Sequence, residues 1–351
     1  MENSAGYSRM SDNRLLKLII SCYGINPLEI IRESSNMFHI STEAESFLLY
    51  KYSHKQDSCL MGLSLKEYLR TNGFPYASDT IEATSGKLYV KHDHSLYYME
   101  KDIKGCTMPL ESLQECREVC HALGAFHSYS AGFKYKGASL RNSFKSLGTK
   151  LHDKWLLALS IKGILERKRL LTDFDRHYLS IIDILITRLQ ICRQLSIGYE
   201  ELCQNARQYP YICHNSIIES LLNTESGEPH LVRFDTASIS VPIYELSELL
   251  KRLMRLDICN WDINALRELI SSYNSSRSIS KQEYEVLLCL LILPDKLLSV
   301  GKKRYIKKRG WSEKKYLQKL DKAVLIHQKQ QQLIPLFEES YGVISDHENY
   351  R

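Results

Sequence analysis

The sequence predicts an α+β fold of two lobes, a small β-rich N-lobe at residues 1–104 and a large helical C-lobe at residues 105–351. Between residues 36 and 103, short runs of alternating apolar and polar residues are separated by turn residues, which is typical of antiparallel strands. Beyond residue 110, apolar residues recur at helical spacing over long stretches. With 351 residues, the chain is long enough to bury a large core.

The elements of the N-lobe follow from the apolar pattern and its interruptions. Gly24 and Pro27 divide residues 13–34 into a helix and a short second helix. The other expected elements are a hairpin at 36–52, a helix at 60–72, further antiparallel strands at 74–103 and a hinge at 105–109.

Nearly all of the C-lobe is predicted to be helical. The expected helices cover residues 110–131, 147–167, 172–206, 243–256, 262–274, 280–294 and 311–332. Strands are expected only near Tyr211-Ile212 and from Leu231 to Phe234. These two strands flank the stretch of sequence that carries the chemistry discussed next.

The composition and the N-terminal residues indicate which partners and which cellular compartment to expect for the protein. A formal net charge of +6 is modest for this length and does not by itself indicate a nucleic-acid binder. The first residues carry no basic region followed by an apolar run, so no signal peptide is expected. The longest apolar run, Val286 to Leu293, is too short to span a bilayer. We therefore expect a soluble chain that is made in the cytoplasm.

The stretch from Cys213 to Leu222, followed by Leu231-Val232-Arg233-Phe234-Asp235, has the layout of a phosphotransferase catalytic loop and metal-binding strand. It resembles the pattern H-G-D-x-x-x-x-N-I-L, followed by D-F-D or D-W-E, of small-molecule kinases related to aminoglycoside and choline kinases. This resemblance implies a protein-kinase-like, aminoglycoside phosphotransferase-like fold. Aligned on Leu221-Leu222, the catalytic Asp becomes Asn215, the metal-binding Asn becomes Ser220 and the first metal-binding Asp becomes Arg233.

These substitutions remove the groups that the chemistry needs. A phosphotransferase needs one acid to accept the hydroxyl proton of its substrate and further oxygen ligands to hold Mg²⁺. A guanidinium cannot bind Mg²⁺ and repels it. The sequence thus predicts a pseudokinase with no catalytic residue, no bound metal and no cofactor. The alternative is an active small-molecule or sugar phosphotransferase that has recruited other groups, such as His214 and Asp235.

Two further positions bear on nucleotide binding. We place the phosphate-binding turn of such kinases at residues 41–46, which contain no glycine and two acids, Glu43 and Glu45. Without glycine the backbone cannot approach phosphates closely, and the acids would repel them. Lys51 falls where these kinases keep a phosphate-contacting lysine, and Glu67 is the acid on the following helix. We expect a vestigial Lys51–Glu67 ion pair; the other interpretation of Lys51 is an ordinary surface lysine.

Over nearly its full length the chain resembles the CotS family of bacterial spore coat proteins. The matching blocks include Leu96-Tyr97-Tyr98-Met99-Glu100-Lys101, Leu123-Gly124-x-Phe126-His127, Lys281-Gln282-x-Tyr284-Glu285, Gly301-Lys302-Lys303 and Trp311-Ser312-x-x-Lys315-Tyr316. The resemblance implies a coat or sporulation protein with other spore coat proteins as partners. It also implies synthesis in the mother-cell cytoplasm and deposition in the spore coat.

A basic segment near the C-terminus is the remaining candidate for binding. Its cations at 302–309 are Lys302, Lys303, Arg304, Lys307, Lys308 and Arg309, with Tyr305 among them and Trp311 just beyond. Such a stretch is typical of sites for an anionic polymer, for example an acidic coat partner or an anionic glycan. The alternative is a solvated helix face. We expect neither specific nucleic-acid binding nor a membrane partner.

Overall fold

The computed structural model describes residues 13–343, apart from 55, 136, 138–143, 145, 225, 226 and 228. The chain forms two compact units. The first combines Met1–Pro109, Phe133–Arg141 and His214–Ser238, and the second combines Leu110–Gly132, Asn142–Cys213 and Ile239–Arg351. Each unit is therefore built from several stretches of sequence, whereas the prediction was two contiguous lobes, 1–104 and 105–351.

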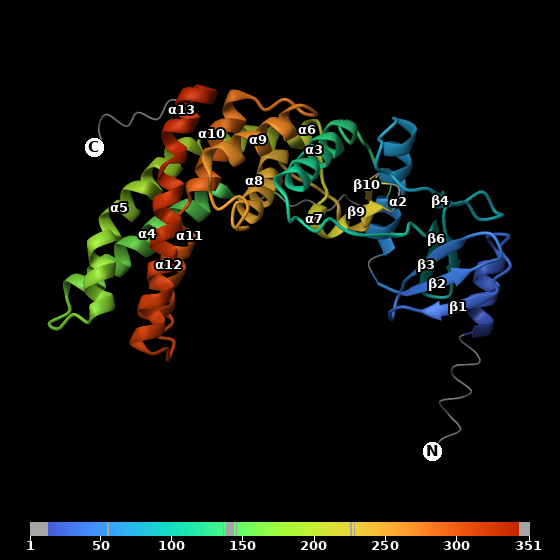
Figure 1. Ribbon diagram of the computed structural model, residues 1–351, viewed down its shortest axis with the longest axis horizontal. Coiled ribbons are helices and arrows are strands. Elements are labelled where there is room, and N and C mark those ends of the chain that lie inside the picture. The colour runs from blue at the N-terminus through green and yellow to red at the C-terminus, as the bar shows by residue number, and fades with distance from the viewer. Residues whose placement is uncertain are drawn as a thin grey trace, which may run out of the picture. The chain divides into compact units, whose positions relative to one another are not determined.

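A six-stranded antiparallel sheet forms the centre of the first unit (Figure 1). Its strands are β1 (Glu29–Arg32), β2 (Met37–Ser41), β3 (Ser46–Tyr52), β4 (Thr80–Ile81), β5 (Val90–His92) and β6 (Ser95–Lys101). They follow the order β1-β2-β3-β6-β4, with β5 also paired to β6. The register places Ser41 opposite Ser46 and Lys51 opposite Tyr97.

The two faces of this sheet carry separate apolar clusters. On one face, helical residues 13–21 supply Leu16, Ile19 and Ile20, which pack with Phe38, Ile40, Phe47, Leu49, Tyr97 and Met99. On the other face, helix α2 (Gln56–Thr71) packs Cys59 and Leu63 against Leu96 and Tyr98. Because side chains alternate along a strand, neighbouring residues of β3 belong to different clusters.

The short second helix predicted within residues 27–34 is wrong, because Glu29–Arg32 form strand β1. The register of β1 and β2 places Ile30 opposite Ile40 and Ile31 opposite His39. Pairing with β2 therefore decides the conformation of four residues whose apolar pattern is too short to distinguish a helix from a strand.

A second, three-stranded sheet completes the first unit. It has the order β10-β9-β7, with β7 (Gly105–Thr107), β9 (Leu221–Thr224) and β10 (Pro229–Leu231). Residues 105–107, predicted to be part of a hinge, thus form a strand. The four-residue helix α7 (Ile217–Ser220) precedes β9, and the 3₁₀ turn η1 (Phe234–Thr236) follows β10.

The second unit is mainly helical, as predicted. Its helices are α3 (Leu113–Tyr129), α4 (Leu147–Glu166), α5 (Asp173–Leu195), α6 (Tyr199–Gln208), α8 (Pro242–Leu253), α9 (Ile263–Asn274), α10 (Lys281–Ile292), α11 (Asp295–Gly301), α12 (Glu313–Gln331) and α13 (Leu333–Tyr341). The π-helical segment η2 (Lys302–Ile306) follows α11, and strand β8 (Ile212–Cys213) pairs with β11 (Ser238–Ile239). The predicted helix 172–206 divides into α5 and α6 at Ser196–Gly198.

Capping residues in the sequence explain where several of these helices begin. Ser112, Thr172 and Ser280 each close a capping box with an acid three residues later, at the starts of α3, α5 and α10. Such a box satisfies backbone N–H groups that have no partner within the helix. Among the described residues, no helix combines the length and apolarity that a membrane span requires.

Candidate functional site

The stretch that resembles a catalytic loop lies in the first unit, where His214 ties it to the following strand. His214 is fully buried, and its Nε2 donates a hydrogen bond to the carbonyl of Val232, at 2.9 Å. The Thr236 hydroxyl donates to the carbonyl of His214, at 2.6 Å. These contacts hold residues 214–216 against the segment that carries Arg233 and Asp235.

Asn215 has a left-handed backbone, with a φ of 67°. Its side-chain Nδ2 donates to the carbonyl of Thr236 and to the hydroxyl of Ser238, at 2.9 and 3.0 Å. Glycine adopts this conformation most readily, and asparagine is among the other residues that tolerate it. Asn215 thus suits the glycine of H-G-D when the motif is aligned on His214, and Ser216 then occupies the position of the catalytic acid. In either alignment, that position holds no carboxylate.

Neutral hydroxyl groups occupy the interior of the loop. The Ser216 hydroxyl lies 3.0 Å from that of Ser220 and 3.0 Å from that of Thr236, and 3.4 Å from Nδ1 of His214. Ser220 is fully buried. These hydroxyls supply one another's hydrogen-bond partners, so they do not need a bound ion. Mg²⁺ sites usually include one or two carboxylates.

Arg233, at the position of the first metal-binding Asp, is exposed and has a φ of 61°. Its carbonyl accepts hydrogen bonds from the hydroxyl and the backbone N–H of Thr236, at 2.8 and 3.2 Å. Residues 232–234, expected to extend a strand, instead leave β10 and enter the turn η1. Within the described parts of the chain, Arg233 forms no ion pair with Asp235.

Asp235 faces helix α2 and strand β3. The turn η1 lies so close to α2 that a Cβ added to Gly62 would come within 2.7 Å of the backbone nitrogen of Asp235. Burial, followed by the charge of the nearby Asp235 carboxylate, raises the pKa of Tyr52 above its ordinary value. The carboxylate that the alternative function would need thus lines the tightly packed space beside α2.

Tyrosines and a buried ion pair fill the space between α2 and the sheet. Tyr98 stacks on Tyr50 and Tyr52, with ring centroids 4.8 and 5.9 Å apart. Lys66 of α2 pairs with Glu100 of β6 at 2.5 Å, and their side chains are 3% and 9% exposed. The residual cavity, lined by Gly62, Lys66, Tyr98, Glu100, Phe234 and Asp235 among others, measures about 10 Å³. This volume is about that of a single water probe, so this cavity has no room for a larger ligand.

The structure does not bring Lys51 and Glu67 together, so the expected ion pair is wrong. Lys51 lies on the sheet face opposite α2, with its ammonium 5.9 Å from the ring of Tyr97. Glu67 instead pairs with Arg70 at 2.8 Å, on the exposed side of α2. Strand alternation explains the error, because Tyr50 and Tyr52 are the β3 residues that face the helix.

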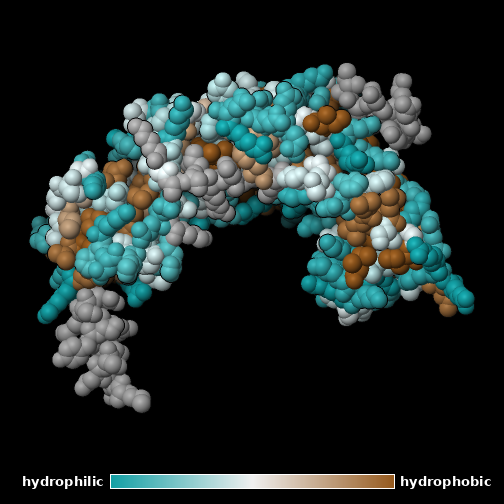
Figure 2. All heavy atoms as spheres, turned by 180° about the vertical axis from the view of Figure 1, so that it is seen from behind, coloured by the Kyte–Doolittle hydropathy of each residue, from teal (hydrophilic) through white to brown (hydrophobic). Residues whose placement is uncertain are grey.

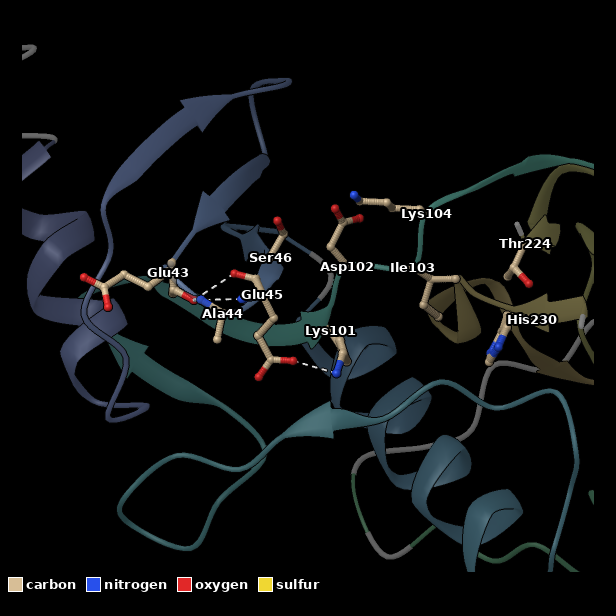
Figure 3. Close-up of a pocket in the computed structure, with 11 residues that line it drawn as sticks. Glu43, Ala44, Glu45, Ser46, Lys101, Asp102, Ile103, Lys104, Thr224 and His230 are labelled. Atoms are coloured by element: carbon tan, nitrogen blue, oxygen red, sulfur yellow. Dashed lines mark hydrogen bonds and ion pairs between the residues drawn. The ribbon is translucent and has the colours of Figure 1, made fainter. Parts of the chain in front are cut away.

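The turn at residues 41–46 lines a polar cavity of about 490 Å³ in the first unit (Figure 3). Figure 3 shows Glu45 reaching toward Lys101, with which it pairs at 2.6 Å, while Thr224 and His230 come from the second sheet. This turn joins β2 to β3, and the first hairpin turn of the sheet is at residues 33–36. Residues 33–36 also lack glycine, so neither hairpin turn lets the backbone approach phosphates as closely as glycine would. The position of the phosphate-binding turn stays a prediction.

A cluster that sequence reasoning did not identify lies in the second unit. The ligand atoms of His127, Cys213 and Glu245 all lie within 4.8 Å of one another. His127 is already hydrogen-bonded on both sides, with Nε2 2.9 Å from Glu245 and Nδ1 2.8 Å from the Tyr273 hydroxyl. Burial lowers the pKa of His127, while the Glu245 carboxylate opposes that shift. A hydrogen-bonded network accounts for these groups without an ion.

Comparisons with known proteins agree with this description of the fold. No family model matches the chain. The structure is similar to that of an aminoglycoside phosphotransferase from Alicyclobacillus acidocaldarius, with a TM-score of 0.71 over 93% of this chain and 96% of the other, at 17% identity. An amicoumacin kinase matches with a TM-score of 0.53 over 94% and 96% of the two chains, at 12% identity. The fold is therefore the kinase-like fold of the aminoglycoside phosphotransferases, with an antiparallel sheet followed by a mainly helical part.

The sequence itself is similar to a more particular protein. Spore coat protein S of Bacillus subtilis is 22% identical over 347 residues, which cover 96% of this chain and 98% of the relative. The chain is a homologue of spore coat protein S with an aminoglycoside phosphotransferase-like structure.

Proposed function

We propose that the protein is a non-catalytic, kinase-like component of the bacterial spore coat, which contributes to coat assembly by presenting surfaces to other coat proteins. Its similarity to spore coat protein S along almost the whole chain supports the coat role. In this proposal, the protein is made in the mother-cell cytoplasm and is then deposited in the coat.

The observation that carries the non-catalytic part is the set of groups at the acid and metal positions. In the alignment on Leu221-Leu222, Asn215, Ser220 and Arg233 stand there, and in the alignment on His214, Ser216 and Leu221 take the first two of these positions. Neither set supplies a carboxylate. The remaining carboxylate, on Asp235, lines a cavity of only about 10 Å³ beside α2. His214, the other group that an active enzyme could recruit, is buried and donates through Nε2 to Val232.

Thermal unfolding with and without Mg²⁺-ATP tests the non-catalytic part. We expect no change in melting temperature, because a ligand stabilises a protein only when it binds the folded state. A site with ATP at about 100-fold above its Kd would gain about 2.7 kcal/mol. Mg²⁺ alone and ATP with EDTA serve as controls. A stabilisation that requires both Mg²⁺ and ATP, and that Asp235→Asn abolishes, would favour the active phosphotransferase instead.

Detection in purified spores tests the coat part independently. The chain should be found in coat extracts of mature spores and should be absent from extracts of a strain that carries a deletion of its gene. The same chain recovered only from the soluble fraction of the mother cell would contradict the coat role, whatever the outcome of the ATP experiment.

A further inference from the structure

Two chain connections place an excess of cations at one end of the helical unit. One joins α4 to α5, at residues 167–172, and the other runs from η2 into α12, at residues 302–315. We call the cations of these connections that form no ion pair with another described residue the basic end. Its members are Arg167, Arg169, Lys302, Lys303, Lys307, Lys308, Arg309, Lys314 and Lys315.

Buried contacts hold the two connections together. The Asp175 carboxylate is fully buried and accepts hydrogen bonds from Lys168, from the Tyr305 hydroxyl and from the backbone N–H of Thr172, at 2.6, 2.7 and 3.0 Å. These contacts, and the surrounding charges, keep the pKa of Asp175 below its ordinary value although burial acts in the opposite direction. The position of the basic end is thus fixed by the core of the unit.

Arg304 belongs to this support, so we separate it from the other cations of the segment. Its guanidinium lies 4.7 Å from the ring centres of both Phe174 and Tyr316 and pairs with Glu313 at 2.6 Å. Its side chain is only 15% exposed. The sequence-based expectation that all six cations of residues 302–309 face a partner therefore does not extend to Arg304.

The neighbouring carboxylates already have partners. Asp173 pairs with Arg176, Glu313 pairs with Arg304, and Lys162 pairs with both Glu166 and Asp183. In the described parts of the chain, the nine cations of the basic end thus have no carboxylate within ion-pair distance. An unbalanced cluster of one sign attracts a partner of the opposite sign and steers its approach.

The aromatic and apolar side chains at this end indicate which kind of polyanion fits. Lys303, Arg309 and Lys315 lie 5.1–5.8 Å from the ring centre of Trp311, so its ring is flanked by the protein's own cations. Leu170 is 88% exposed and Ile306 is 45% exposed. Figure 2 shows a mixed hydrophilic and hydrophobic surface over this end of the helical unit.

We propose that the basic end binds an acidic segment of a partner polypeptide. Six of the nine cations are lysines, which act as point charges and do not impose the bidentate geometry that suits phosphate groups. Binding of single-stranded nucleic acid relies on aromatic rings that stack on bases, and Trp311 is flanked by cations. A polypeptide can also supply apolar side chains to cover Leu170 and Ile306. This inference does not depend on whether the kinase-like site is active.

Binding of poly-L-glutamate to the full chain, measured by fluorescence anisotropy at several salt concentrations, tests the proposal. The test variant replaces Lys302, Lys307, Lys308 and Lys314 by glutamine. The matched control replaces Lys17, Lys87, Lys281 and Lys296, which are exposed elsewhere, and changes the net charge equally. We expect the test variant to weaken binding about tenfold or more and to flatten its salt dependence, with little effect of the control.

Two further probes distinguish the sources of negative charge. Double-stranded DNA and phosphatidylglycerol vesicles should bind more weakly than poly-L-glutamate at the same salt concentration. A random glutamate–tyrosine copolymer should bind more tightly than poly-L-glutamate, and Leu170→Ser should remove that gain. Tighter binding of DNA or vesicles, no binding of poly-L-glutamate, or an equal loss in the matched control would overturn the proposal. Equal melting temperatures of the variants would show that folding is intact.

Discussion

Replacing Lys66 by methionine should lower the free energy of unfolding by about 3–5 kcal/mol, because it leaves the Glu100 carboxylate buried without its partner. The two side chains lie 2.5 Å apart and are 3% and 9% exposed. Methionine keeps most of the packing of the lysine stem. The lost free energy of unfolding therefore reports mainly the unpaired Glu100 carboxylate. Equilibrium unfolding in urea at neutral pH measures this effect, with the slope of the transition checked for two-state behaviour.

Two further variants show whether the loss comes from the unpaired charge. The double variant Lys66→Met/Glu100→Leu should recover most of the stability, because removing both partners of a buried pair is often neutral or stabilising. Arg70→Met breaks the exposed pair with Glu67 on the same helix and should have a much smaller effect. A Lys66→Met variant no less stable than Arg70→Met would contradict the assignment of a buried ion pair.

This pair also bears on the proposed loss of activity. In the kinases that the sequence resembles, a strand supplies the lysine and the following helix supplies the glutamate. Here helix α2 supplies the cation, Lys66, and strand β6, which follows the helix in the chain, supplies the carboxylate, Glu100. The Lys66 ammonium is buried against Glu100 and has almost no exposed surface to offer a phosphate. An ion pair thus connects helix α2 to the sheet, but its lysine is not available to bind a phosphate.

The order of the two parts and most helices could be predicted from the sequence, because strand and helix periods differ over long stretches. The sequence does not predict which face of β3 packs against α2. In Phe47-Leu48-Leu49-Tyr50-Lys51-Tyr52, nearly every residue is apolar or aromatic, so the pattern does not show which alternate set faces the helix. The sequence therefore places Lys51 on the wrong face and does not indicate that Tyr52 packs against α2.

The substituted catalytic loop could be identified from the sequence, but its alignment could not be fixed. Only the left-handed φ of Asn215 and the bond from His214 to Val232 favour Ser216 in the place of the acid. The role of each cation in the basic segment could not be predicted from the sequence either. Arg304 is structural because Asp175 and Phe174, about 130 residues earlier in the chain, lie beside it. A charge run cannot reveal contacts of such long sequence separation.

Acidification from pH 7 to pH 4.5 should destabilise the protein in part through one buried histidine, His327 of α12. Both of its ring nitrogens are buried and have no hydrogen-bond partner among the residues that the structure describes. Burial, followed by the charge of Arg188, lowers the pKa of His327 to about 4. The unfolded state, with an ordinary histidine pKa of about 6.5, therefore binds a proton first as the pH falls. Stability is unaffected by this group above pH ~6.5 and declines as the pH falls toward about 4.

The variant His327→Leu should remove this contribution. Between pH 7 and pH 4.5, its free energy of unfolding should fall by about 2 kcal/mol less than that of the wild type, as obtained from the pKa difference. The full difference below pH ~4 should approach about 3 kcal/mol. His94→Gln changes a histidine in an exposed turn and serves as the control. Parallel pH profiles for wild type and His327→Leu would show that His327 is protonated equally in both states, and the neutral buried ring inferred from its contacts would then be wrong.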